Sequence, residues 1–163
     1  MRSCTARPLL LVDVDGVVSL FGFAHLPPAG LLPTVVEGVP HLLSSHAGPL
    51  LARLSDTFEC VWCTGWEERA EEHLPGLLGL PGGWPHLSFA NGLGAQPRHW
   101  KLDAIESHAG PDRPLAWIDD AFDAGCDAWA AARAAPTLLV RTEPSAGLLA
   151  EHVSVLERWA RRL

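Results

Sequence analysis

Apolar residues gather in five short runs separated by longer mixed segments, a spacing that predicts strands alternating with helices. The expected strands are residues 9–14, 57–63, 86–90, 115–119 and 137–141. The first run shows neither clean alternation nor helical spacing, as expected for a strand buried on both faces of a sheet. Helix-forming composition appears at 46–55, from 67, from 98 and at 121–135. This order predicts an α/β fold, a three-layer sandwich around a mainly parallel five-stranded sheet.

Two further regions complete a single domain that we expect to span residues 1–163. The stretch 19–44 is rich in glycine and proline with short β-like pieces, and predicts a hairpin-like flap rather than a second domain. In residues 144–163 the apolar positions recur at helical spacing, which predicts an amphipathic helix packed on the sheet. A chain of 163 residues has the length of one domain with a substantial core.

Polar side chains stand where three of the predicted strands end. These end positions are Asp13 and Asp15, then Thr64 and Gly65, then Asp119 and Asp120. Lys101 lies early in the helical segment that begins near residue 98, from where its long side chain can reach the same edge. Because ligands of parallel sheets sit at the carboxyl ends of the strands, we expect these groups to converge.

This combination of carboxylates, a hydroxyl and an ammonium suits phosphoryl transfer. Mg²⁺ needs only one or two protein carboxylates, which Asp13 and Asp119 can supply, because water and a substrate phosphate complete its octahedron. Once its charge is offset, a carboxylate can attack phosphorus and form an aspartyl-phosphate. A second carboxylate two residues away, Asp15, can act as general acid and then as general base. Thr64 can bind phosphoryl oxygens, and Lys101 can balance charge.

Four segments in this order, LLLVDVDGVV, VWCTGW, HWK and AWIDD, resemble the four motifs of the haloacid-dehalogenase (HAD) superfamily. The resemblance covers about residues 9–141 and implies a Rossmann-like fold of the HAD type and a Mg²⁺-dependent phosphatase. TGW, WIDD and the later PTLLV also resemble small HAD-type domains related to those of multidomain RNA-repair proteins. Val17 is a departure, because many phosphatases of the family have Thr after this glycine, and it weakens any assignment of subtype.

The resemblance implies a role for each candidate residue. Asp13 would be the nucleophile and a Mg²⁺ ligand, and Asp15 the general acid and base, with its backbone carbonyl on the metal. Thr64 and Gly65 would bind the phosphoryl group. Lys101 would be the lysine that balances the charge of nucleophile and phosphate.

The acids that end the fourth strand would complete the metal site. Asp119 would bind the metal directly, and Asp120 would hold a metal-bound water. Asp123 fits an alternative spacing for this second acid, although a carboxylate there can instead favour a helix N-terminus; the spacing favours Asp120. The expected metal-binding set is Asp13, Asp15, Asp119 and Asp120, with Mg²⁺ as the cofactor.

Motif order and spacing narrow the subtype. Response-regulator receivers place their lysine last, whereas here Lys101 precedes the final acid pair, which disfavours that class. The intervals 16–61 and 64–101 are too short for a full cap domain. We therefore expect an open site, which in this family goes with macromolecular substrates or with capping by another subunit.

Composition bears on partners and compartment. The chain is 48% hydrophobic and 19% charged, and it holds no run of about 18 apolar residues that would span a membrane. We read no export signal at its start, and the four cysteines lack the spacing of a disulfide framework, which favours the cytoplasm. The 12 Lys and Arg residues form no long basic run and the formal net charge is −7. Strong nonspecific nucleic-acid binding is therefore not expected.

Three functions remain open on sequence alone. The first is a phosphatase acting on a phosphorylated substrate, small or macromolecular; a homo-oligomer is compatible with it. The second is a nucleic-acid end-processing phosphatase that works with partners, and the third is a noncatalytic binding module of the HAD fold. Trp66, Trp84 and Trp100 can stack on a substrate ring, although packing in the core or at its rim is favoured. Cys60 and Cys63 should point to opposite faces of a strand, which disfavours zinc or redox roles.

Overall fold

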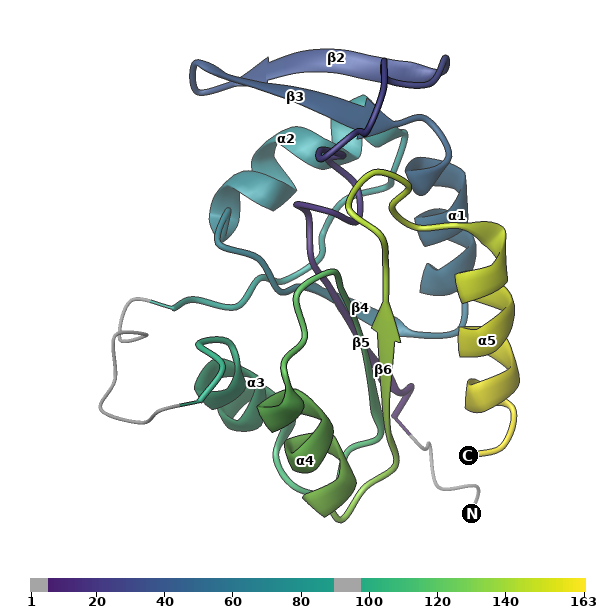
Figure 1. The fold of residues 1–163 in the computed structure, drawn as a ribbon. Coiled ribbons are helices and arrows are strands. Elements are labelled where there is room, and N and C mark those ends of the chain that lie inside the picture. Colours follow the sequence, from purple (N-terminus) through teal and green to yellow (C-terminus); the bar gives the residue numbers. More distant parts are fainter. Residues whose placement is uncertain (1–5, 90–97) are drawn as a thin grey trace.

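The computed structural model describes residues 6–89 and 98–163, and a parallel sheet forms its centre (Figure 1). The strands follow the order β4-β1-β5-β6. Their bounds are Leu9–Val12 for β1, Glu59–Trp62 for β4, Leu115–Asp119 for β5 and Thr137–Arg141 for β6. Every residue of β1 is fully buried, because β1 pairs on both edges, with Leu10 opposite Cys60 of β4 and Ala116 of β5. The continuous apolar run at the start of the chain is explained by this central position.

The described part of this sheet holds four strands, where the sequence predicts five. Residues 86–89 contribute a single parallel bridge, from His86 to Trp62, and the Leu87 N–H donates to the Trp62 carbonyl at 2.9 Å. Pro85 precedes this bridge and has no N–H with which to extend a ladder. Residue 90, the last of the predicted strand, lies outside the described residues.

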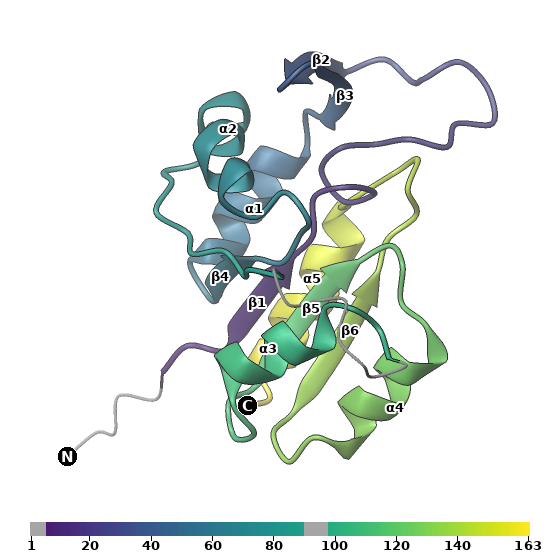
Figure 2. The same cartoon turned by 90° about the vertical axis from the view of Figure 1, so that its left-hand side faces the viewer.

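Helices cover both faces of the sheet, as the predicted three-layer arrangement requires. Side chains of α1 (Ala47–Ser55), α2 (Glu68–Leu78) and α5 (Ala150–Ala160) share one core with Leu10 and Val12. Side chains of α3 (Leu102–Ala109) and α4 (Ala124–Ala132) share the other core with Leu9 and Leu11. Figure 2 shows α3 and α4 in front of the sheet and α1 and α5 behind it. None of the helices in the described ranges is long and apolar enough to cross a bilayer.

Local capping sets where two of the helices begin and end. Asp123 has an extended backbone and its side chain accepts a hydrogen bond from the Cys126 N–H at 2.9 Å, so α4 begins after it. The helix predicted at 121–135 therefore begins only at Ala124, and it ends at Ala132 because Arg133 has an extended backbone. Gly79 ends α2 in the left-handed conformation with φ 70°, which glycine adopts without steric cost.

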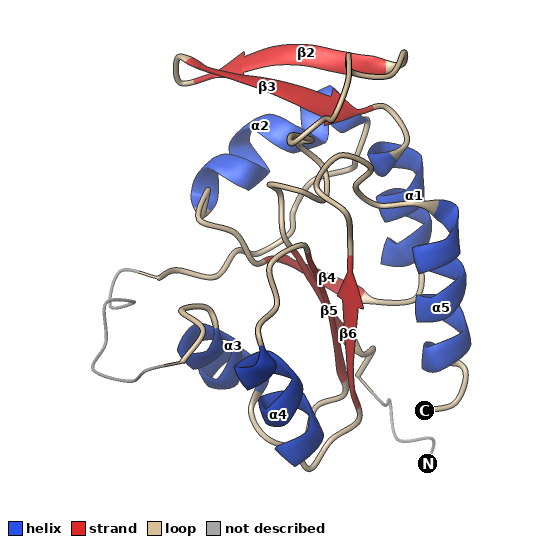
Figure 3. Cartoon of the chain, in the orientation of Figure 1, coloured by secondary structure: helices blue, strands red, loops and turns tan. Residues whose placement is uncertain are grey.

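The predicted flap contains an antiparallel hairpin of β2 (Leu31–Val36) and β3 (Val39–Ser44). Glu37 and Gly38 join the strands, and both have positive φ, as a tight hairpin turn requires. On the other side of β3, the Leu20 N–H donates to the Leu42 carbonyl at 2.8 Å. Figure 3 shows the hairpin above the end of the sheet toward which β6 points, so it stands over the carboxyl ends of the strands.

Candidate functional site

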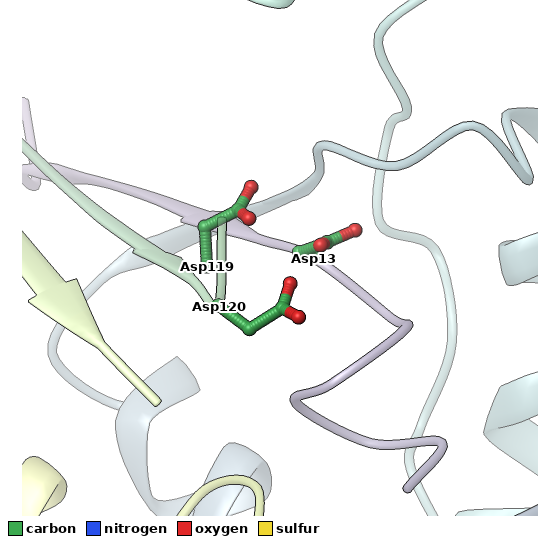
Figure 4. A group of neighbouring side chains, drawn as sticks. All are labelled: Asp13, Asp119 and Asp120. Carbon is green, nitrogen blue, oxygen red and sulfur yellow. The ribbon is translucent and has the colours of Figure 1, made fainter. Parts of the chain in front are cut away.

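Three carboxylates meet where two neighbouring strands end (Figure 4). Asp13 directly follows β1, Asp119 is the last residue of β5, and Asp120 follows it. β1 and β5 pair in parallel with Val12 opposite Ile118, so the residues after them emerge at the same edge. One oxygen of each carboxylate lies within 4.8 Å of the corresponding oxygens of the other two. The predicted convergence of Asp13, Asp119 and Asp120 is therefore present.

Lys101 joins this cluster from the residue before α3. Its Nζ lies 3.1 Å from Asp13 Oδ1 and 2.6 Å from Asp119 Oδ2. Lys101 is 3% exposed, Asp13 6% and Asp119 1%, so the ammonium and both carboxylates are removed from water. Asp119 is also held by the Trp117 indole N–H, at 3.1 Å, and by the Ala121 backbone N–H, at 3.0 Å.

The charges of the cluster are not balanced. Burial and the Asp119 carboxylate raise the pKa of Asp13 and the Lys101 ammonium opposes them, with the net result that this pKa is raised to about 7. Burial also disfavours the charged form of Lys101, yet the negative charge around it, that of Asp13 foremost, raises its pKa overall. The pKa of Asp120 is raised by burial and by Asp119. Three carboxylates thus face one ammonium, and a second positive charge would lower the free energy of the ionised site.

The donor set fits a hard divalent cation. Mg²⁺ binds oxygen at about 2.0–2.1 Å in an octahedron, which places oxygens on opposite sides about 4 Å apart. The oxygens of Asp13, Asp119 and Asp120 have separations of this order. These three side chains could therefore hold a metal ion that prefers oxygen ligands.

Asp123 takes a different position from Asp120. Its carboxylate caps α4, and the hydrogen bonds from the Cys126 N–H lower its pKa. Of the two acids that the spacing allows for the cluster, Asp120 is the one whose carboxylate lies beside Asp13 and Asp119. Asp123 acts in helix capping, the other role that its position suggested.

Asp15 lies outside the three-carboxylate cluster, and its side chain is exposed. The Trp66 indole N–H donates to Asp15 Oδ2 at 3.1 Å and orients this carboxylate. The Trp66 ring in turn packs against His41 of β3, with ring centres 4.6 Å apart, and His41 Nδ1 lies 2.9 Å from the Ser19 hydroxyl. No local sequence signal points to His41, because it reaches the site only through the placement of the hairpin.

Gly16 allows the chain to pass close to the cluster. Its φ is 77°, and a Cβ built on it would lie 2.4 Å from Asp120 Cγ. The Gly16 N–H donates to the Ser19 carbonyl at 2.8 Å, which closes the turn after Asp15. Glycine is required here both by the backbone conformation and by the nearness of Asp120.

Thr64 and Gly65 follow β4, beside the end of β1, where the Cys63 N–H donates to the Val12 carbonyl at 2.8 Å. Thr64 is 1% exposed and its hydroxyl accepts from the Trp66 N–H at 3.2 Å. Trp100 is 45% exposed, its ring would be 3.8 Å from a Cβ on Gly65, and Lys101 Nζ lies 5.1 Å from the ring centre. Trp100 thus stands at the mouth of the site.

Trp84, Cys60 and Cys63 contribute to the packing of the domain. Trp84 contacts the buried Trp62, with ring centres 4.9 Å apart. Cys60 lies in the core beneath α1, and Cys63 in the core beneath α3, so the two thiols occupy opposite faces as the strand period predicts. Burial raises the pKa of Cys60 to about 12, which leaves it a thiol at neutral pH.

The arrangement combines a buried acid beside an ammonium, a cluster of oxygen donors and a second acid held by an indole. Comparison with protein-family models and with curated proteins finds no match to this chain. The functional argument therefore rests on the residues and their geometry.

Proposed function

We propose that this chain is a Mg²⁺-dependent phosphohydrolase of the HAD type that releases phosphate through an aspartyl-phosphate on Asp13. The observation that carries the proposal is the buried Lys101, which contacts both Asp13 and Asp119 beside Asp120. Burying such charges costs folding free energy that their mutual attraction need not repay. A binding or catalytic role accounts for that cost, because a divalent cation would balance the three carboxylates and the one ammonium and allow a phosphate monoester to approach.

Two acids divide the proposed reaction. A carboxylate oxygen of Asp13 attacks phosphorus, and the bond from phosphorus to the leaving oxygen breaks while Asp15 gives that oxygen its proton. Water then attacks the phosphorus of the aspartyl-phosphate, and Asp15 takes the proton of the water. The bond between phosphorus and Asp13 breaks, which releases inorganic phosphate, restores the Asp13 carboxylate and leaves Asp15 protonated as at the start.

The other residues hold the reacting groups. Lys101 keeps the charge of Asp13 compatible with an approaching phosphate, and Thr64 and the N–H of Gly65 bind phosphoryl oxygens. Trp66 positions Asp15 through its indole N–H. When bound by Asp13, Asp119 and Asp120, with the backbone carbonyl of Asp15, Mg²⁺ supplies positive charge that neutralises the phosphoryl oxygens.

The test is phosphate release in the presence of Mg²⁺ from sugar phosphates, aryl phosphates, nucleotides, phosphopeptides and a 3′-phosphorylated oligonucleotide. Asp13→Asn should lower the rate by at least about 10³-fold, because the substitution removes the nucleophile. A chelator should lower the rate by a similar factor, because it removes Mg²⁺. Asp123→Asn is the matched control, since asparagine keeps the helix cap and the position lies outside the cluster.

The outcomes separate the three functions. A strong preference for the oligonucleotide would favour nucleic-acid end processing over a small substrate. If circular dichroism shows that the protein is folded and no compound releases phosphate, the noncatalytic binding module becomes the favoured function.

A further inference from the structure

An open groove with a volume of about 770 Å³ has Asp15 among its lining residues. It runs between residues 19–23 and the β2–β3 hairpin, above the carboxyl end of the sheet. The apolar side chains along it include Leu20, Phe21, Phe23, Pro33, Val35 and Leu42. No Lys or Arg is found among the described residues that line it. The volume is in the range of sites that bind small molecules.

Two of these apolar side chains face water although they adjoin a candidate site. Phe21 is 48% exposed and Val35 is 67% exposed. Apolar side chains gathered along a groove are typical of a ligand site. A ligand that covered them would gain binding free energy in proportion to the apolar area removed from water.

We propose that the groove binds the alcohol part of the substrate, and that this part is an uncharged aromatic ring such as a phenol or a naphthol. This assignment of substrate class rests on the proposed phosphatase function. In that reaction Asp15 protonates the leaving oxygen, so the leaving group must lie on the Asp15 side of the phosphorus. Asp15 is one of the residues that line the groove, so the leaving group would lie against it.

Charge excludes the main alternative occupants. A nucleotide or oligonucleotide carries further phosphates, which need Lys or Arg partners that the described lining lacks. Ser19, Thr34 and His41 are the polar side chains that line the groove, and they can hydrogen-bond a ring substituent.

An occupant would also contact the residues that hold Asp15. His41 lines the groove, packs on Trp66 at 4.6 Å between ring centres, and lies 2.9 Å from the Ser19 hydroxyl. Trp66 donates to Asp15 at 3.1 Å. A ring against His41 would therefore restrict the hairpin in the position that orients the general acid, which links ring binding to catalysis.

The test compares kcat/KM for 1-naphthyl phosphate and for glycerol phosphate in the native protein and three variants. Phe21→Ala and Val35→Ser should each lower kcat/KM for naphthyl phosphate by about tenfold and leave that for glycerol phosphate within about twofold. Leu32→Ser is the matched control. Leu32 is also exposed on β2, at 42%, but it lies on the face opposite Val35 and does not line the groove.

A second measurement separates this proposal from the proposed activity. 1-Naphthol is added to isotopically labelled Asp13→Asn protein, and the backbone amide signals of residues 19–23, 34 and 35 are followed by NMR. If no phosphate ester is hydrolysed but naphthol shifts these signals in a Phe21-dependent manner, the phosphatase fails and the aromatic site remains.

Hydrolysis without preference for the aryl ester, or with equal losses in Leu32→Ser, would overturn the groove proposal while the phosphatase stands. Absence of both hydrolysis and naphthol binding would overturn both. Preference for a nucleotide would also contradict the uncharged leaving group.

Discussion

Two ion-pair clusters near the start of α3 bring the same kinds of charge together in different surroundings. Lys101 contacts Asp13 and Asp119 with all three groups buried. Arg98 contacts Asp103 and Glu106, and its side chain is 32% exposed while theirs are 61% and 46% exposed. In each cluster one cation contacts two carboxylates, so the number of ion pairs does not distinguish the clusters.

The two clusters contribute differently to stability because one is exposed to solvent and the other is buried. Water and salt screen the exposed pairs around Arg98, so their net contribution to stability is small. The buried groups around Lys101 lose their hydration and depend on one another, so removing one leaves the others without compensation. A sheet edge that buries charge in this way is suited to bind a charged ligand, whereas an exposed helix face is suited to solubility.

Removal of the buried cation should have the largest effect. Lys101→Ala leaves Asp13 and Asp119 facing each other without a counter-charge, and should lower the free energy of unfolding by about 3–5 kcal/mol at pH 8 without divalent ions. Urea denaturation followed by tryptophan fluorescence measures this. The loss should shrink at pH 5, where a carboxyl can take up a proton. A loss at pH 8 no greater than that of Arg98→Ala would remove the distinction between the clusters.

Stability should fall as the pH rises through the range in which Asp13 ionises. The folded pKa of Asp13 is raised from 3.8 to about 7, so between these values the folded state binds the proton that the unfolded state has released. Stability therefore decreases from about pH 4 to pH 7 and is then constant, by an upper bound of about 4 kcal/mol. Urea denaturation at pH 5 and pH 8 should show this decrease in the native protein and a smaller one in Asp13→Asn. Mg²⁺ should stabilise the native protein more at pH 8 than at pH 5; equal pH dependence in both proteins would contradict the assignment to Asp13.

A substitution at Gly16 should disturb the buried cluster without changing its charge. Gly16→Ala places a methyl group 2.4 Å from Asp120 Cγ at a backbone φ of 77°. We expect a loss of about 1–3 kcal/mol in stability and about tenfold in Mg²⁺ affinity by calorimetry, because Asp120 must move. Gly38→Ala is the control, since φ there is 83° but nothing lies within 4 Å of the added Cβ. If Gly38→Ala weakened Mg²⁺ binding as much as Gly16→Ala does, displacement of Asp120 would not be the cause of the loss.

The exposed cluster should give the smallest effect. Arg98→Ala should change the free energy of unfolding by less than about 1 kcal/mol, and high salt should reduce the difference further. Glu106 keeps a partner in the variant, because the Trp129 indole N–H donates to it at 2.9 Å. Urea denaturation at low and at high salt measures the change. A loss comparable to that of Lys101→Ala, unaffected by salt, would show that exposure does not separate the two clusters.

The strands that the apolar pattern predicted best are those whose ends coincide with a change in polarity. β5 and β6 have the predicted bounds of 115–119 and 137–141. β1 and β4 end earlier than predicted, at Val12 and Trp62. The apolar residues that follow them, Val14 and Cys63, are buried without belonging to a strand, so the apolar pattern runs on beyond the strand. Over 86–89, the described part of the predicted strand at 86–90, a single bridge from His86 to Trp62 forms, and Leu87 is buried in the core that it shares with α3.

The sequence by itself determined that acids, a threonine and a lysine stand at or near the ends of strands that run in parallel. Adjacent parallel strands end at one edge, so the meeting of Asp13 with Asp119 follows from local pattern and sheet geometry. Tertiary structure alone decided that Asp120 joins them while Asp123 caps α4, and that Lys101 touches two carboxylates. It also decided that the hairpin brings His41 and an apolar groove beside Asp15. These contacts join segments far apart in the chain, and their positions depend on how whole elements pack, which no local propensity encodes.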